Sequence, residues 1–489
     1  MRRRHDLALC KLYNSPVEQK RDETTKVEKK SYARLLAPVL ILICVGLLGA
    51  VLFTLARIPS HKSVKYEAPP VLKPINPVDQ DASDIMRLAL TSDKPQTTLS
   101  ATTRLQFLAI PDLKEGMLAL KERGLLWDYI GVLPELHYLG YEKAEEELNG
   151  YLASADLQTV VTALDALRRM PPMSCRDELL DCLKQPHTDM AFYGTRVLKE
   201  WNKSDDEINE VLLNIMDLAP VASSRIAAAT TLYQLGVEKE KAWAELTRLL
   251  NKATMDMIPS LLDFFKESGD RRAPELVASQ VDQEQYQMVA LAALVNLKWS
   301  GKEKLLAKWD NKVSSLNQYL IYVNREAGGK KTRLSEIITK IKTNKPIEPD
   351  SKKPKGGAIP KPLNESQQAA ALSEIANALR AWDDPKAIPY FEQLVDKGPR
   401  LVRMEVARNL RKFENNRRAI DLAIRLLEGA KDDRELREVA TTLGFIDNGR
   451  SLARMHDLML QTEDEETKLT FAWAILNINR QHASSYARR

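Results

Sequence analysis

The chain has 489 residues, of which 44% are hydrophobic and 28% are charged, so it can bury a substantial core and is not a disordered tail. Its formal net charge of +5 arises entirely in residues 1–34, which hold ten Lys and Arg side chains against five acidic ones. The rest of the chain carries 62 basic and 62 acidic side chains, that is, 72 less ten and 67 less five. This balance argues against nucleic acid as a partner.

Residues 35–56, LLAPVLILICVGLLGAVLFTLA, contain no charged side chain. As a helix, this segment would be about 33 Å long, enough to cross a hydrocarbon core of about 30 Å. It therefore predicts a single transmembrane helix, with the membrane as a partner. Two alternatives fit less well. A buried core helix usually keeps a polar face, and a cleaved signal peptide has a shorter apolar run and a shorter charged leader.

The charges on either side of this segment predict its orientation. The basic tail 1–34 precedes it, whereas the next 24 residues hold four basic side chains, Arg57, Lys62, Lys65 and Lys73. The positive-inside rule then places the N-terminus in the cytoplasm and the bulk of the chain outside it. Residues 57–80 contain five prolines, which predict an extended stalk of up to about 75 Å.

Only two of the four cysteines, Cys175 and Cys182, follow the stalk. If both lie on the helix indicated by SCRDELLDCL, they are about 10 Å apart, beyond the disulfide limit of about 7 Å between α-carbons. An extracytoplasmic region without a disulfide framework favours a bacterial inner membrane, with the bulk of the chain facing the periplasm.

A local pattern recurs about every 32 residues from residue 81 onward. In the C-terminal part a small residue precedes a larger apolar one by three positions, at Ala376, Ala407, Ala440 and Ala472. Earlier, a small residue precedes Leu167, Leu198, Leu232, Phe264 or Leu294 by four positions, namely Ala163, Gly194, Ala228, Ser260 and Ala290. Turn signals separate these segments, so each unit is predicted to be two helices, and no segment predicts a sheet.

Residues 343–364, TNKPIEPDSKKPKGGAIPKPLN, interrupt this repeat pattern with five prolines and five lysines. The composition predicts a flexible linker between one array over 81–342, clearest over 150–300, and a second over 365–489. An inserted loop between stacked repeats is an equally open interpretation.

The segments DDRELREVATTLGFIDN and GPRLVRMEVARNLRKFEN resemble short HEAT-like repeats, in which the second helix opens with an acidic or turn residue, then Val/Leu-Arg, then A-x-x-L. Arg403 and Arg437 occupy the Arg position of that pattern, and Lys468 replaces it in the last unit. The resemblance is looser over about 150–300 and poor over 81–149 and 300–342. It implies an all-α fold, an α-solenoid of antiparallel helix pairs after one N-terminal transmembrane helix. Tetratricopeptide repeats have a similar period, but their Trp, Gly-Tyr and Pro landmarks do not recur here.

No motif in the sequence identifies a reaction. The chain has no phosphate-binding loop, no pair of histidines at metal-ligand spacing and no nucleophile elbow, so we expect no catalytic residue, no metal and no cofactor.

The candidate interaction face is a group of basic side chains in and after VRMEVARNLRKF, namely Arg400, Arg403, Arg408, Arg411, Lys412, Arg417 and Arg418. A nucleic-acid or acidic-lipid site is one interpretation. A solvated face, paired with acids on neighbouring repeats, is the favoured one, because residues 365–489 balance at 20 basic and 20 acidic side chains.

These observations favour a membrane-anchored scaffold, without catalysis of its own, that binds an unidentified protein or peptide outside the cytoplasm. The alternative is a tethered HEAT-like lyase, as in light-harvesting systems, or a carrier of a small ligand. The anchor and stalk favour the scaffold. The sequence does not decide the oligomeric state.

Overall fold

The computed structural model describes residues 77–489 except 107, 185–187, 310–314, 346–362 and 487–489. All of its elements belong to one compact unit, His61–Arg489, and this description concerns that unit alone. Within the described residues the chain forms 24 α-helices and two short 3-10 helices, and no strand. The predicted all-α class is confirmed. The predicted transmembrane helix 35–56 lies outside the described residues.

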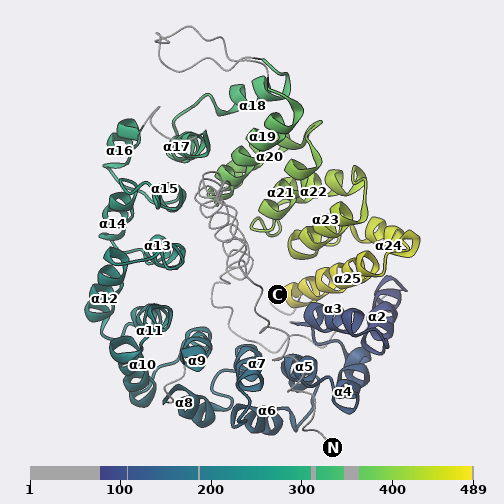
Figure 1. The fold of residues 1–489 in the computed structure, drawn as a ribbon. Coiled ribbons are helices and arrows are strands. Elements are labelled where there is room, and N and C mark those ends of the chain that lie inside the picture. The colour runs from purple at the N-terminus through teal and green to yellow at the C-terminus, as the bar shows by residue number, and fades with distance from the viewer. Residues whose placement is uncertain (1–76, 107, 185–187, 310–314, 346–362, 487–489) are drawn as a thin grey trace, which may run out of the picture. The chain divides into compact units, whose positions relative to one another are not determined.

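Consecutive helices form hairpins, in which an even-numbered helix comes first and an odd-numbered helix follows (Figure 1). The first helices of the hairpins have even numbers: α2 (Pro77–Leu90), α4 (Lys114–Glu122), α6 (Ala144–Leu152), α8 (Arg176–Lys184), α10 (Asp206–Leu218), α12 (Lys239–Asn251), α14 (Ala273–Gln280), α16 (Lys302–Trp309), α18 (Leu334–Lys342), α20 (Ile388–Val395), α22 (Arg417–Glu428) and α24 (Leu452–Gln461). The 3-10 helices η1 (Pro111–Leu113) and η2 (Pro385–Ala387) precede α4 and α20.

The second helices of the hairpins have odd numbers, and each packs against the next odd-numbered helix along the chain. They are α3 (Pro95–Leu105), α5 (Leu126–Tyr138), α7 (Leu157–Leu167), α9 (Thr188–Trp201), α11 (Ala222–Leu235), α13 (Ile258–Glu267), α15 (Gln287–Leu294), α17 (Ser315–Ala327), α19 (Glu365–Arg380), α21 (Arg400–Leu410), α23 (Asp433–Ile446) and α25 (Glu465–Tyr486). This packing of sequential neighbours is that of a solenoid.

The recurring small residues lie where odd-numbered helices approach one another. The seven alanines of the pattern are fully buried, at positions 163, 228, 290, 376, 407, 440 and 472. Gly194 on α9 instead allows close packing within its own hairpin, because a Cβ atom there would lie 2.8 Å from the Leu183 side chain on α8. Ser260 is the exception: it is exposed, because α13 buries Ile258, Leu261 and Leu262 around it.

Polar side chains reinforce several of these helix contacts. Buried Asn324 on α17 donates to the Leu291 carbonyl on α15 at 2.9 Å, and buried Asn409 on α21 donates to the Ala376 carbonyl on α19 at 3.1 Å. Asn477 on α25 likewise donates to the Gly444 carbonyl on α23 at 2.7 Å. Each bond gives a side-chain NH2 group a carbonyl partner on the preceding odd-numbered helix and so favours one register of adjacent hairpins.

Helices on the two sides of residues 346–362 pack directly together. α17 contacts α19, and α18 contacts both α19 and α20. The Lys342 ammonium donates to the Gln393 carbonyl at 2.7 Å, and the Asn296 amide on the α15 side donates to the Ala381 carbonyl at 2.8 Å. The packing of the array therefore continues from the hairpins before this segment to those after it.

The packing order of the array closes on itself, because α25 packs against α2 and α3 (Figure 1). Lys94 of the first hairpin forms an ion pair with Glu465 at 2.6 Å, and Arg104 on α3 contacts Glu466 and donates to the Thr470 hydroxyl at 3.0 Å. The odd-numbered helices from α3 to α25 thus form a complete circuit of contacts, which the sequence pattern did not predict.

This antiparallel arrangement defines two edges of the array. The even-to-odd edge carries the turns that lead from each even-numbered helix to the next odd-numbered one. The odd-to-even edge carries the turns that lead from each odd-numbered helix to the next even-numbered one. Because the two helices of a hairpin run in opposite directions, these turns lie at opposite ends of the helices.

Candidate functional surfaces

The basic residues predicted as an interaction face lie on and after α21, and most of them are paired with acids of neighbouring hairpins. Arg400 contacts Asp432 at 2.9 Å. The Arg403 guanidinium donates two hydrogen bonds to the Glu435 carboxylate, at 2.6 and 2.8 Å. Arg408 and Arg411 share Glu438 on α23, with a distance of 2.8 Å from Nε of Arg408.

The other three residues of this predicted face also have partners. Arg418 donates to Glu392 on α20 at 2.9 Å, and Arg417 lies 4.0 Å from Asp421 on its own helix. Lys412 points toward the C-terminal end of α19, where its ammonium donates to the Arg380 and Trp382 carbonyls at 2.7 and 2.6 Å. Burial lowers the pKa of Lys412 to about 8. An external anion at this face would therefore compete with contacts already formed inside the array.

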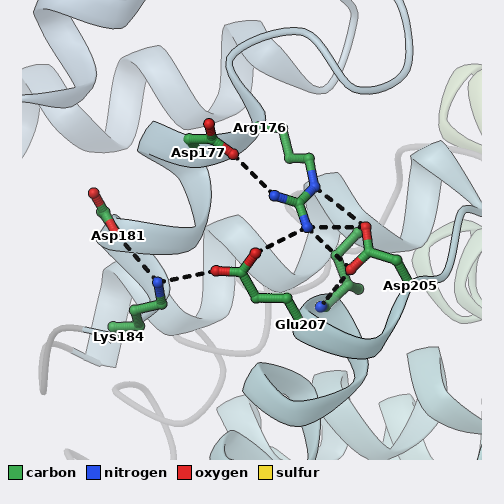
Figure 2. A network of polar contacts seen from close by, with 7 residues as sticks. Arg176, Asp177, Asp181, Lys184, Asp205 and Glu207 are labelled. Atoms are coloured by element: carbon green, nitrogen blue, oxygen red, sulfur yellow. Dashed lines mark hydrogen bonds and ion pairs between the residues drawn. The ribbon is translucent and has the colours of Figure 1, made fainter.

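Figure 2 shows a second charged network, which joins α8 to the start of α10. The Arg176 guanidinium donates to Asp205, Asp177 and Glu207, and Lys184 donates to Glu207 at 3.2 Å. Asp205 also caps α10 by accepting from the Ile208 N–H at 2.9 Å, and this backbone bond together with Arg176 lowers the pKa of its carboxyl. The network links two adjacent hairpins and leaves its charges satisfied.

The buried ionisable groups outside these networks include one ion pair and two cysteine thiols. Arg169 pairs with Glu135 through two bonds of 2.7 and 2.8 Å, and both side chains are almost fully buried. Cys175, which lies just before α8 and not on it, and Cys182 on α8 are both buried and free. Burial raises the pKa of the Cys175 thiol to about 12, so it is not poised as a nucleophile.

A cleft of about 550 Å³ opens at the odd-to-even edge, between the α17–α18 turn and the start of α20. Its lining combines aromatic and proline surface with polar and charged side chains: Glu326, Gly329, Lys331, Ser335, Trp382, Lys386, Pro389, Tyr390 and Gln393. Ser335 and Gln393 are joined by hydrogen bonds of 2.8 and 3.0 Å, which hold the two sides of the cleft together.

The polar groups at the base of the cleft are oriented by their own contacts. Glu326 accepts bonds from the Thr332 N–H and hydroxyl at 2.7 and 2.8 Å, which fixes the α17–α18 turn. Burial and a hydrogen bond to Glu326 raise the pKa of Tyr390 to about 12, so its phenol stays protonated at neutral pH. Tyr390 also packs against Trp382, with ring centroids 6.1 Å apart.

Sequence reasoning did not find this cleft. The cleft joins Trp382, which follows α19, to the turn at 328–333, which follows α17. The two segments meet only because α17 and α19 are adjacent in the array, and 17 of the residues between them lie in the segment that is not described. One signal in the sequence could have indicated the cleft: two consecutive odd-to-even turns, at 328–333 and 381–387, belong to neighbouring repeats.

The large hydrophobic side chains that are exposed in the described residues lie at one edge of the array. In the first two hairpins they are Leu88, Leu99, Leu126 and Trp127. In later hairpins they are Leu218, Val221, Met255, Met288, Leu401 and Leu460. Each lies within a few residues of an even-to-odd turn, at the end of α2, α10 or α24 or around the start of α3, α5, α11, α13, α15 or α21.

The described residues contain neither a candidate metal site nor a candidate membrane-spanning helix. No group of three or more His, Cys, Asp or Glu side chains there is placed to hold a metal ion. No helix in this part of the chain has the length and apolar character needed to cross a membrane.

Comparison with known proteins assigns no family to the chain. No family model matches it, and no curated protein matches it. Among solved structures, it is similar to an engineered protein whose crystal structure was a target of the Northeast Structural Genomics Consortium, at 16% identity over 82% of this chain and 99% of that chain. The TM-score of that match is 0.19, and at this level it carries no argument about function.

Proposed function

We propose that the protein is a membrane-anchored scaffold of the HEAT-like class, which binds a protein or peptide partner outside the cytoplasm and catalyses no reaction. The charge-free segment 35–56 and the basic tail before it support the anchor and its orientation. The helical hairpins, with small residues at their contacts, support the repeat class.

The cleft at the odd-to-even edge is the observation that carries partner binding. Pro389 and Tyr390, with the nearly buried Trp382 behind them, supply the kind of rigid aromatic and apolar surface that dominates recognition of protein segments. Lys331 and Lys386 stand exposed beside it, and Lys386 is 3.6 Å from Asp384. This combination fits a short segment of the partner that presents an apolar or aromatic side chain next to an acidic one.

A small ligand is a second candidate occupant of the same cleft. The volume of about 550 Å³ is within the range of small-molecule sites, and this favours the tethered carrier or lyase among the alternatives. A bound chromophore would give the purified full-length protein an absorbance above 400 nm. A colourless protein with no copurifying small molecule would remove this candidate.

Photo-crosslinking in cells tests the scaffold function at the cleft. A photoreactive amino acid replaces Lys386, which lines the cleft, or Lys203, which is exposed on the same edge at the α9–α10 turn. We expect one extracytoplasmic protein to crosslink from position 386 and not from position 203. The charge reversal Lys331→Glu should weaken that crosslink. Equal capture at both positions, or none at 386, would contradict the proposed site.

The anchor is tested separately by washing membranes with carbonate. The full-length protein should stay in the pellet. A soluble form that begins near Arg57 would instead show that the segment is cleaved.

A further inference from the structure

The exposed hydrophobic side chains of the array are separated from its cleft. In the described residues they lie at the even-to-odd edge, whereas the cleft opens at the odd-to-even edge. The odd-to-even turns present charged and polar groups instead, such as Lys203 before α10 and Glu238 before α12. Both edges carry exposed charges, such as Asp93 and Lys94 at the even-to-odd edge, and they differ in where the exposed large hydrophobic side chains lie.

The distribution of these side chains along the even-to-odd edge indicates how extended a binding partner must be to cover them. They occur at seven different even-to-odd turns, from the first hairpin to the last. The edge on which these turns lie is closed, because α25 packs against α2 and α3, although some of its turns, such as α6–α7 and α22–α23, carry no exposed large hydrophobic side chain. A short peptide or a small domain would contact only adjacent turns, whereas an extended surface contacts all of them at once.

The chain outside the described residues supplies such a surface. Residues 35–56 are charge-free and fit a bilayer, and only residues 57–76 separate them from α2. Extended like polyproline, those 20 residues would reach about 60 Å, which exceeds the length of about 21 Å for the 14 residues of α2. The tether is thus long enough for either edge to reach the membrane.

We propose that the even-to-odd edge rests on the bilayer that anchors the chain, with the exposed Leu, Met, Val and Trp side chains inserted at the lipid–water interface. Trp127 and the leucines have the side chains that partition into this region. The cleft then faces away from the membrane and stays open to a partner. This inference rests on the proposed anchor.

The lipid chemistry follows from the charges beside these side chains. Leu218 follows Asp217 and Met255 precedes Asp256, whereas Leu88 follows Arg87 and Leu401 follows Arg400, so charges of both signs accompany the apolar groups. Contact with the bilayer is therefore driven by apolar insertion and does not require anionic head groups.

Tryptophan quenching in vesicles tests this placement on the full-length protein. The protein is reconstituted into phosphatidylcholine vesicles whose acyl chains carry bromine close to the head groups. Trp127, with 56% of its surface exposed, is the only tryptophan of the exposed class in the described residues. We expect brominated lipid to quench part of the fluorescence, and Trp127→Phe to remove the quenched component.

Two further variants in the Trp127→Phe background form a matched pair on the hairpin of α10. Leu218→Trp places the probe at the even-to-odd edge, and Lys203→Trp places it at the opposite edge. Quenching should return in Leu218→Trp and be absent in Lys203→Trp. Equal quenching of the two would contradict the orientation.

The possible failures are distinguishable. Protein that carbonate releases from the vesicles would overturn the anchor, and this inference with it. Protein that stays anchored while neither Trp127 nor Leu218→Trp is quenched would overturn the inference alone. If these probes are shielded from acrylamide but not quenched by bromine, a second copy or another protein covers the edge, and the bilayer does not.

Discussion

His456 and Asp81 lie 375 positions apart in the chain, yet the Nε2 atom of His456 is 2.8 Å from an Oδ atom of Asp81. This contact joins α24 to α2, where the last hairpin meets the first. An open helical array exposes an apolar face at each end and needs polar capping repeats. Here each terminal hairpin covers the other, so that Met86 on α2 and Phe471 on α25 are both fully buried.

Leu410 and Leu401 are a matched pair on α21, because the first is fully buried and the second is 62% exposed. Leu410→Ala should lower the free energy of local opening by about 2 to 5 kcal/mol, since it leaves a cavity in the helix contact. Leu401→Ala should change it by less than about 0.5 kcal/mol. Native-state hydrogen exchange of α21 measures both, and equal effects would show that the faces of this helix are misassigned.

The pair Arg403–Glu435 is expected to matter more than exposed ion pairs, because the Glu435 side chain is fully buried. Arg403→Ala removes both hydrogen bonds that the guanidinium donates to that carboxylate. It should lower the free energy of unfolding by about 3 kcal/mol or more. The double variant Arg403→Met, Glu435→Met should recover much of this loss. Arg417→Ala, at an 86% exposed side chain, is the control and should change the free energy of unfolding by less than about 0.5 kcal/mol.

Because of Lys302, we expect the free energy of unfolding to rise at alkaline pH. Its ammonium donates to the Leu294 and Val295 carbonyls at 2.7 and 3.0 Å, and burial lowers its pKa from 10.5 to about 8. Between these two values the unfolded chain binds a proton that the folded chain lacks, so raising the pH favours folding.

The comparison of wild type with Lys302→Met isolates this contribution. From pH 8 to 10.5 the stability of the wild type should increase relative to the variant, with a slope of at most about 1.4 kcal/mol per pH unit. Below pH 8 the difference should be constant. Denaturant titrations at several pH values measure it. A difference that falls as the pH rises would contradict the assignment.

Cys175 and Cys182 should resist thiol reagents in the folded protein. Both are buried, and burial raises the pKa of each thiol. In a variant with Ser at positions 10 and 44, we expect no maleimide labelling under native conditions and two labels after unfolding. Rapid native labelling would show that the hairpin of α8 opens readily.

The sequence predicted the elements of the array well and its long-range packing poorly. The period of about 32 residues located the odd-numbered helices, because a small residue must lie at each close helix contact. Even so, Ser260 was assigned to a contact and is exposed, since a single polar residue in an apolar segment does not fix the phase. The hairpins around α2–α6 and α16–α17 match the pattern poorly, yet they pack into the same circuit.

The closure and the cleft depend on contacts that no local pattern encodes. Lys94 and Glu465 read as ordinary surface charges, and only their meeting shows that the first hairpin is the neighbour of the last. The sequence grouped the basic residues on and after α21 as one face. Their acidic partners, Asp432, Glu435 and Glu438, lie about one repeat further along, and whether this face binds a partner stays a prediction.

Crosslinking of α2 to α24 within one chain tests the closed packing order, on which the closed even-to-odd edge depends. Cysteines replace Asp81 and His456 in the full-length protein with Ser at positions 10 and 44, and membranes are treated with a short bifunctional maleimide. We expect an efficient crosslink within single chains, and none for a control pair at positions 81 and 203. No crosslink between 81 and 456, or crosslinks only between two chains, would contradict it.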